Sequence, residues 1–136
     1  MNTFASLALA LLGSSAMAAP GTTPAFDGSR NLLCALTQLQ QCRADEGCKP
    51  AAFAETNLPQ FLRFDFKAKT ISGRRADGTL VSSPIVSRQS IGENLVLQGT
   101  EGEYGWSMSL SAGGELGLAL TAPTFTALAF GACTDD

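Results

Sequence analysis

Residues 106–121 read WSMSLSAGGELGLALT, and this stretch decides the fold class. On both sides of the glycine-rich centre at residues 112–115, large apolar residues alternate with small or polar ones. An alternation with a period of two is typical of a half-buried β-strand, and a Gly-rich link between two such strands indicates a hairpin. We therefore predict a hairpin with a polar face of Ser107, Ser109 and Ser111 and a core face of Trp106, Met108, Leu110, Leu116, Leu118 and Leu120.

Further strand signals lie on both sides of this hairpin. Residues 61–66 read FLRFDF and alternate cleanly, and Ala76-Asp77-Gly78 is a turn signal of the kind that joins antiparallel strands. Pro84 interrupts one strand region and indicates an edge or a bulge there. The remaining strand regions are Thr70–Gly73, Thr79–Ser90, Leu95–Gln98 and Phe125–Gly131. Short strands with turns between them predict a mainly β domain, either an antiparallel meander or a small barrel.

The region before these strands gives a mixed signal. Leu32, Leu33, Leu36 and Leu39 fit helical spacing, although Leu32, Cys34 and Leu36 also fit a strand. We predict a short N-terminal helical segment over Asn31–Gln41, with a strand as the alternative. Lys49–Pro59 is predicted to be a connector with one helical turn at Ala51–Glu55.

The N-terminus carries an export signal. The first 18 residues contain no charged side chain, and Phe4–Leu12 forms an apolar run that is too short to span a bilayer. Ala16-Met17-Ala18 resembles a signal-peptidase site, so we expect cleavage after Ala18. The predicted organisation is a signal peptide at 1–18, a flexible leader without core residues at 19–30, and one domain at 31–136. Once the signal peptide is removed, we expect no stable membrane insertion.

Four cysteines, Cys34, Cys42, Cys48 and Cys133, follow the export signal. In a small exported protein, four cysteines indicate two disulfides, and three connectivities are possible. Cys34 and Cys42 cannot approach within about 7 Å if the segment between them is regular. Of the two remaining connectivities, we prefer the one in which Cys42–Cys48 closes the polar loop 43–47 and Cys34–Cys133 joins the two ends of the domain. The alternative, four thiolates on zinc, is disfavoured because the spacing contains no CxxC pair.

The composition excludes many kinds of function. The 136 residues include no His, which removes the Ser/His/Asp and Cys/His catalytic sets and His-ligated zinc. With nine Lys+Arg against twelve Asp+Glu, the net charge of −3 lacks the basic excess that nucleic-acid binding requires. We therefore expect no catalytic residue, no metal ligand, no cofactor and no nucleic-acid partner.

Charge is nevertheless distributed unevenly along the chain. The basic residues after Lys49 are Arg63, Lys67, Lys69, Arg74, Arg75 and Arg88, whereas residues 89–136 contain six acids and no Lys or Arg. The basic stretch could meet an anionic envelope component, and the acidic turns at Glu93, Glu101, Glu103 and Glu115 could meet a cationic protein. The alternative, which we favour, is that these residues lie on solvated turns and strand faces and pair weakly.

Glu101-Gly102-Glu103, with Tyr104 and Trp106 close by, is the one candidate for a catalytic or calcium-binding carboxylate pair. The sequence does not set the separation of the two carboxylates, and a hairpin tip with two acids is usually only a solvated turn. Trp106 alternates in phase with Met108 and Leu110, which predicts a core position. We therefore do not expect catalysis there.

Several strings resemble those of small exported proteobacterial proteins of uncharacterised function, namely residues 58–66, 95–99, 105–108 and 130–134. This resemblance implies export and a β-rich domain, and it carries over no site residue. In overall plan, an exported β meander with two disulfides, the chain is also similar to the periplasmic inhibitors of c-type lysozyme, without their characteristic loop motif.

The function expected from the sequence is that of a periplasmic or extracellular, non-catalytic binding or inhibitory module with unknown binding residues. A structural or stress-protective envelope protein without a specific ligand is the first alternative. A carboxylate-dependent hydrolase that uses Glu101 and Glu103 is the second.

Overall fold

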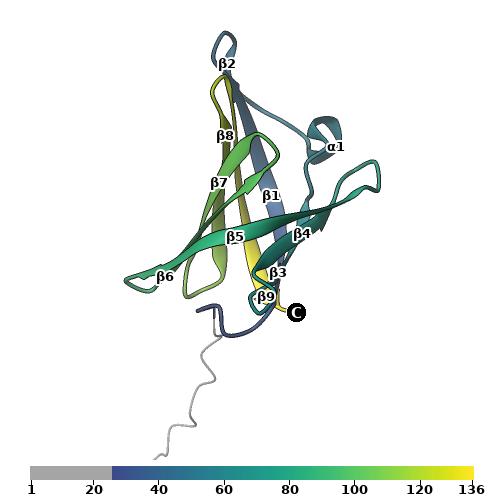
Figure 1. Ribbon diagram of the computed structural model, residues 1–136. Helices are drawn as coiled ribbons and strands as arrows, with labels where there is room; N and C mark the ends of the chain where they lie inside the picture. Colours follow the sequence, from purple (N-terminus) through teal and green to yellow (C-terminus); the bar gives the residue numbers. More distant parts are fainter. Residues whose placement is uncertain (1–25) are drawn as a thin grey trace, which may run out of the picture.

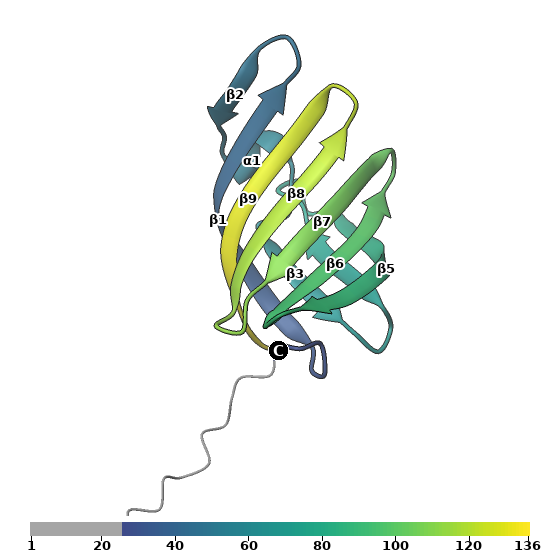
Figure 2. The same cartoon turned by 90° about the vertical axis from the view of Figure 1, so that its left-hand side faces the viewer.

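The computed structural model describes residues 26–136, so the predicted signal peptide and its cleavage site after Ala18 lie outside the described residues. Nine strands and one short helix follow one another as β1 (Leu32–Arg43), β2 (Gly47–Pro50), α1 (Phe53–Thr56), β3 (Phe61–Asp65), β4 (Thr70–Arg74), β5 (Leu80–Ile91), β6 (Asn94–Glu101), β7 (Tyr104–Leu110), β8 (Glu115–Ala122) and β9 (Phe125–Asp135). All pairings are antiparallel between neighbours, and β1 also pairs with β9. Eight strands thereby close into a barrel, while β2 extends β1 as a projecting hairpin (Figures 1 and 2).

The predicted hairpin is confirmed as β7 and β8, with Leu110 paired to Leu116 and Trp106 paired to Leu120. Trp106, Met108, Leu110 and Leu116 are buried, and Leu118 and Leu120 are half-buried members of the same core. On the opposite face Ser109 is exposed, and Ser107 and Ser111 are half-buried. At this hairpin the large apolar side chains therefore face the inside of the barrel and the small residues face outward, as the alternation predicts.

The helical segment predicted over Asn31–Gln41 is wrong, because this region forms strand β1. Leu32, Cys34 and Leu36 point inward with a period of two. The register against β9 then shifts between Leu36 and Gln38, and the extra residue brings Leu39 inward as well. Because of this β-bulge, the inward-facing leucines of β1 stand at positions 32, 36 and 39. Residues with this spacing would also share one face of a helix. The helix of the structure is α1, within the predicted connector.

Both predicted disulfides are confirmed, and each joins residues that lie directly opposite on paired strands. Cys34 on β1 faces Cys133 on β9, and Cys42 on β1 faces Cys48 on β2. The first bond joins residues 99 positions apart across the seam that closes the barrel. The second holds the β1–β2 hairpin, whose turn is the polar segment 43–47. Two disulfides are typical of an oxidising compartment.

The end of the barrel where Phe26, the first described residue, and the C-terminus lie is closed, and we call it the terminal end. Phe26 is buried in the core here, so the leader contributes a core residue, contrary to the expectation for residues 19–30. Its ring lies against Gly114, where a Cβ atom would come within 2.9 Å of it. The Arg88 guanidinium lies over the ring of Phe66 and donates hydrogen bonds to the carbonyls of Asp27 and Gly28, at 2.9 and 3.2 Å. Among residues 26–136, no helix is long and apolar enough to cross a membrane.

Candidate functional site

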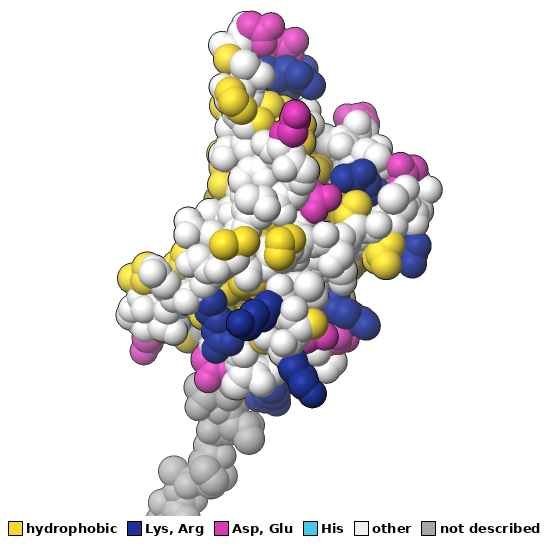
Figure 3. Space-filling view, viewed as in Figure 1, with side chains coloured by type: hydrophobic (Ala, Val, Ile, Leu, Met, Phe, Trp, Pro, Cys, Tyr) yellow, Lys and Arg dark blue, Asp and Glu magenta, His cyan; other side chains and the backbone are white. Residues whose placement is uncertain are grey.

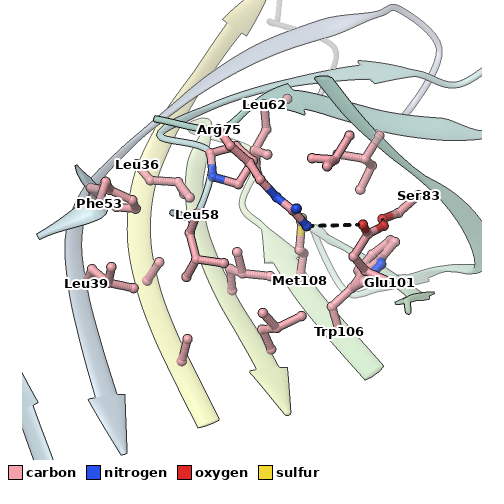
Figure 4. A pocket seen from close by; sticks show the side chains of 18 of the residues that line it. Leu36, Leu39, Phe53, Leu58, Leu62, Arg75, Ser83, Glu101, Trp106 and Met108 are labelled. Carbon is pink, nitrogen blue, oxygen red and sulfur yellow. Dashed lines mark hydrogen bonds and ion pairs between the residues drawn. The ribbon is translucent and has the colours of Figure 1, made fainter. Parts of the chain in front are cut away.

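The opposite end of the barrel, which we call the α1 end, contains an apolar cavity of about 100 Å³. Every strand of the barrel contributes to its wall, and Phe53 of α1 and Leu58 cover one side (Figure 4). The other apolar lining residues are Leu36, Leu39, Pro59, Leu62, Ile71, Val81, Trp106, Met108, Leu118, Leu120, Ala127 and Ala129. The interior is therefore solid toward the terminal end and hollow beneath α1.

The hollow has a cause in the sequence of β9. Leu32, Leu95 and Leu110, which are at most 2% exposed, fill the interior toward the terminal end. Strand β9, by contrast, presents only Ala127 and Ala129 toward the cavity. Both alanines are buried, and their methyl groups leave the space between β1 and β8 unfilled. Small inward side chains on one strand thus produce a cavity that the large residues of the facing strands do not fill.

Two glycines position the large groups that surround the cavity. At Gly99 on β6, a Cβ atom would come within 2.2 Å of the Pro84 carbonyl oxygen and 2.3 Å of the Trp106 ring, so the missing side chain lets β5 and the indole approach β6 closely. At Gly73 on β4, a Cβ atom would come within 2.6 Å of Pro59. The connector can therefore cross β4 closely and bring Leu58 over the cavity.

Four polar residues line the cavity, namely Ser72, Arg75, Ser83 and Glu101. We call Arg75, Ser83 and Glu101, which lie next to one another at one side, the rim. Glu101 is the last residue of β6 and its side chain points inward, as Figure 4 shows. Its Oε2 accepts a hydrogen bond from the Ser83 hydroxyl, and its Oε1 lies 3.7 Å from Nη2 of Arg75. The Arg75 and Glu101 side chains are 36% and 31% exposed, so both charges remain in contact with water.

The residues between β2 and β3 form a strap over the α1 end, residues 51–60. The strap is tied to β1, since the Ala51 amide donates to the Leu39 carbonyl at 3.0 Å and the Leu36 amide donates to the Gln60 carbonyl at 2.8 Å. At its far side, Asn57 Nδ2 donates to the Asp77 carboxylate at 3.0 Å. Asp77 lies in the β4–β5 turn, two residues after Arg75, so the strap and the rim are joined.

Hydrogen bonds lower the pKa of the Asp77 carboxyl group. The Thr79 amide donates to it at 2.8 Å and lowers its pKa most, and the Asn57 amide and the charge of Arg75 add to this effect. The same type of contact lowers the pKa of Glu115, mainly through the Ser111 hydroxyl, and that of Asp27, mainly through Ser29. All three are turn carboxylates that stabilise local backbone.

The structure separates the two members of the predicted carboxylate pair. Glu101 enters the cavity wall, whereas Glu103 is exposed in the β6–β7 turn and lines an outer depression together with Tyr104 and Phe125. Trp106 is buried at 6% exposure, which confirms its predicted core position. Within residues 26–136, no three His, Cys, Asp or Glu residues gather in a way that could hold a metal ion.

The basic stretch does not form one surface either. Arg74 and Arg75 lie at the α1 end of β4, whereas Lys67 and Lys69 lie in the β3–β4 turn near the terminal end. Arg63 pairs with Asp136 at 3.0 Å, and Arg30 pairs with Asp135 at 2.8 Å. Figure 3 shows basic and acidic side chains side by side toward the terminal end. This mixture matches the interpretation of solvated, weakly paired charges.

Sequence reasoning named Arg75 only as a member of a basic stretch. It named Glu101 as a member of an acidic turn and of the pair Glu101/Glu103, and it did not consider Ser83. Their meeting depends on the curvature that brings β4, β5 and β6 around the cavity, which no local motif encodes. One signal was present, because Ser83 and Glu101 each interrupt the apolar side of their strands. Comparisons with protein-family models, with curated proteins and with solved structures each found no match for this chain.

Proposed function

We propose that this protein is an exported, non-catalytic binding module whose cavity takes the apolar part of a small ligand. The observation that carries the proposal is the hollow α1 end, with about 100 Å³ of space lined by apolar side chains and bordered by the rim. The size is of the order of the ~150 Å³ apolar cavity that binds benzene or xenon in an engineered protein. A short aliphatic chain or one ring fits such a space.

The energetic cost of an empty cavity supports this proposal. At about 24 cal/mol per Å³, a cavity of about 100 Å³ corresponds to about 2.4 kcal/mol of lost packing. This is a large share of the roughly 5–15 kcal/mol by which a domain is usually stable. Larger residues at Ala127 and Ala129 would recover this energy. A ligand that fills the cavity recovers the same packing energy, and the binding site is kept.

The polar groups around the cavity favour binding over catalysis. The sequence contains no His, and among residues 26–136 no lysine lines the cavity. The Ser83 hydroxyl donates to Glu101, and the third group beside this pair is the Arg75 guanidinium, a cation that favours the charged carboxylate as a recognition group rather than as a base that activates Ser83. The rim therefore offers hydrogen bonds and charge to a ligand, which are the elements of recognition.

Export is tested on the full chain. After expression in a bacterium with a two-membrane envelope, N-terminal sequencing should show that the mature protein begins at Ala19 and fractionates outside the cytoplasm. A soluble cytoplasmic product that still begins at Met1 would refute this part of the proposal.

Ligand binding is tested through Trp106, the single tryptophan of the sequence, which lines the cavity and reports on it by fluorescence. The probes are n-alkanols of increasing length. Each added methylene should raise the affinity about fourfold, since burial of a CH₂ contributes about 0.8 kcal/mol, until the cavity is full and the gain stops. A binding protein gives this plateau. A ligand-free structural protein gives no saturable change in fluorescence.

Two variants make the test specific to the cavity. Ala129→Leu adds three carbons inside the cavity and should abolish the alkanol response, and Ala127→Val gives a milder filling. Ala132→Leu adds the same three carbons on the exposed face of the same strand and should leave the response unchanged. Equal responses in Ala129→Leu and Ala132→Leu, with both proteins folded by near-UV circular dichroism, would show that alkanols bind elsewhere.

A further inference from the structure

We infer that the ligand is a zwitterionic α-amino acid with an apolar side chain, held with its carboxylate on Arg75, its ammonium on Glu101 and its side chain in the cavity. The inference rests on the proposed binding function and adds the chemical class of the ligand. Its basis is that one positive and one negative side chain stand together at the border of an otherwise apolar space (Figure 4).

The two rim charges are close but are not engaged with each other by a direct hydrogen bond. The 3.7 Å between Arg75 Nη2 and Glu101 Oε1 exceeds the 2.7–3.2 Å of an N–H···O hydrogen bond. Among residues 26–136, Glu101 is the only acid within 4.0 Å of the Arg75 guanidinium, and Asp77 interacts with the Arg75 charge over a longer distance. The guanidinium keeps its planar set of N–H donors, which matches a carboxylate in a bidentate manner. Glu101 Oε1 remains an acceptor for a cationic donor.

The backbone of the β4–β5 turn fixes the base of the Arg75 side chain, and Ser83 holds the Glu101 carboxylate. The Arg75 amide donates to the Thr79 carbonyl at 2.9 Å, and the Arg75 carbonyl accepts from Gly78 at 2.9 Å, so the guanidinium starts from a hydrogen-bonded turn. Glu101 is held by the Ser83 hydroxyl on the neighbouring strand. A site whose charges are positioned in advance loses less conformational entropy when a ligand binds.

A pair of opposite charges discriminates against ligands that carry one charge. A simple carboxylate on Arg75 would lie beside the like charge of Glu101, and a simple amine on Glu101 would lie beside Arg75. An amino acid brings both signs, separated by a single carbon, and meets each rim group with its opposite. Because the rim is about one-third exposed, the charged head of the ligand stays partly hydrated, and its full desolvation is avoided.

The cavity selects the side chain. Met108 and Leu118 line it and offer no hydrogen bond to a charged or amide side chain, and Trp106 carries a single N–H donor on an otherwise apolar ring. A branched side chain of four carbons is a suitable size for about 100 Å³. Phe53 and Leu58 of the strap cover the side chain, and the Asn57–Asp77 hydrogen bond ties the strap to the turn that carries Arg75.

The experiment compares L-leucine with probes that each lack one feature, using Trp106 fluorescence and calorimetry on the mature protein. The probes are 4-methylpentanoate without the ammonium, 3-methylbutylamine without the carboxylate, glycine without the side chain, and N-acetyl-leucinamide with neutral amides in place of both charges. L-leucine should bind at least tenfold more tightly than each of them. Binding of N-acetyl-leucinamide as tightly as L-leucine, or of 4-methylpentanoate as tightly, would overturn the inference.

Rim variants assign the charges. Arg75→Gln should weaken L-leucine at least tenfold and leave 3-methylbutylamine unweakened, and Glu101→Gln should weaken L-leucine at least tenfold and leave 4-methylpentanoate unweakened. Glu103→Gln, in the same turn but outside the cavity, and Arg43→Gln, on the projecting hairpin, are matched controls that should bind L-leucine as the wild type does. Equal losses in Glu101→Gln and Glu103→Gln would overturn the assignment.

The alkanols separate this inference from the function on which it rests. If alkanols bind and Ala129→Leu blocks them while L-leucine binds no better than its truncated probes, the cavity is a binding site and the ligand class is wrong. If neither alkanols nor L-leucine produce a saturable response, both proposals fall.

Discussion

Replacing Leu110 by Ala tests the division of the barrel into a solid and a hollow part. Leu110 is 1% exposed and packs toward the terminal end, where the neighbouring Leu95 and Leu116 are at most 2% exposed. The change removes three carbons, which costs about 2.4 kcal/mol at about 0.8 kcal/mol per buried CH₂. A residual hole of about 50 Å³ adds about 1.2 kcal/mol at about 24 cal/mol per Å³. We therefore expect a total loss of about 3.6 kcal/mol.

The assay is equilibrium urea unfolding with both disulfides intact, followed by Trp106 fluorescence and far-UV circular dichroism. With a slope of about 1.5 kcal/mol per M, a loss of about 3.6 kcal/mol lowers the urea midpoint by about 2.4 M. Ser109→Ala, one residue away on the exposed face, should stay within about 0.5 kcal/mol of the wild type.

Leu120→Ala provides the second comparison, because Leu120 is half-buried and already borders the cavity. Since its side chain has fewer neighbours to lose, we expect it to cost less than Leu110→Ala. Equal costs for Leu110→Ala and Ser109→Ala would refute the one-sided burial of β7. A cost for Leu120→Ala that equals or exceeds that of Leu110→Ala would refute the hollow α1 end.

The remaining predictions concern the disulfides, the strap and β6. Replacing Cys34 and Cys133 by Ala should lower the free energy of unfolding by about 4.7 kcal/mol, because this disulfide joins residues 99 positions apart. Replacing Cys42 and Cys48 by Ala should lower it by about 2.3 kcal/mol, because that loop is short. Urea unfolding of the two double variants measures both losses. Folding lowers the pKa of Asp77 below 3.8, so its stabilisation is complete above pH 3.8 and is lost as the pH falls through the lower, folded value. The Asp77→Asn variant should therefore show a shallower acid decline in unfolding free energy than the wild type. Identical slopes would contradict the lowered pKa of Asp77, whose largest cause is the Thr79 amide. Gly99→Ala should destabilise the barrel and shift the fluorescence emission of Trp106, because the new methyl group would contact the indole. The control Gly102→Ala lies in the open β6–β7 turn and should leave the emission unchanged, although its φ of 57° makes the substitution strained.

The strand pattern and both disulfides could be predicted from the sequence, because each depends on local chemistry. A strand exposes its two faces alternately whatever it packs against, so the alternation at residues 106–121 assigns Leu110 to the core before any partner is known. The reach of the backbone excluded a bond between Cys34 and Cys42, which lie on one extended strand. Of the two remaining connectivities, the one that closes the short polar loop 43–47 is the one observed.

The wrong helix prediction over Asn31–Gln41 shows what a local sequence pattern cannot decide. A bulge after Leu36 gives β1 a spacing that a helix would also produce, and only pairing with β9 and β3 decides between the two. The pairing of β1 with β9 brings together residues about a hundred positions apart. Phe26 is a similar case, because a single aromatic residue in a Pro- and Gly-rich leader becomes a core residue only when Gly114 and the barrel end offer a place for it.

The sequence by itself thus determined the β class, the faces of the strands and the disulfide pairs, because periodicity and chain reach are properties of the backbone near each residue. The tertiary structure alone decided that the meander closes, that Ala127 and Ala129 face large residues across a gap, and that Arg75, Ser83 and Glu101 meet at its rim. The physical reason is that a cavity and its charges arise from strand curvature and register around the whole barrel, to which every strand contributes and which no single segment encodes.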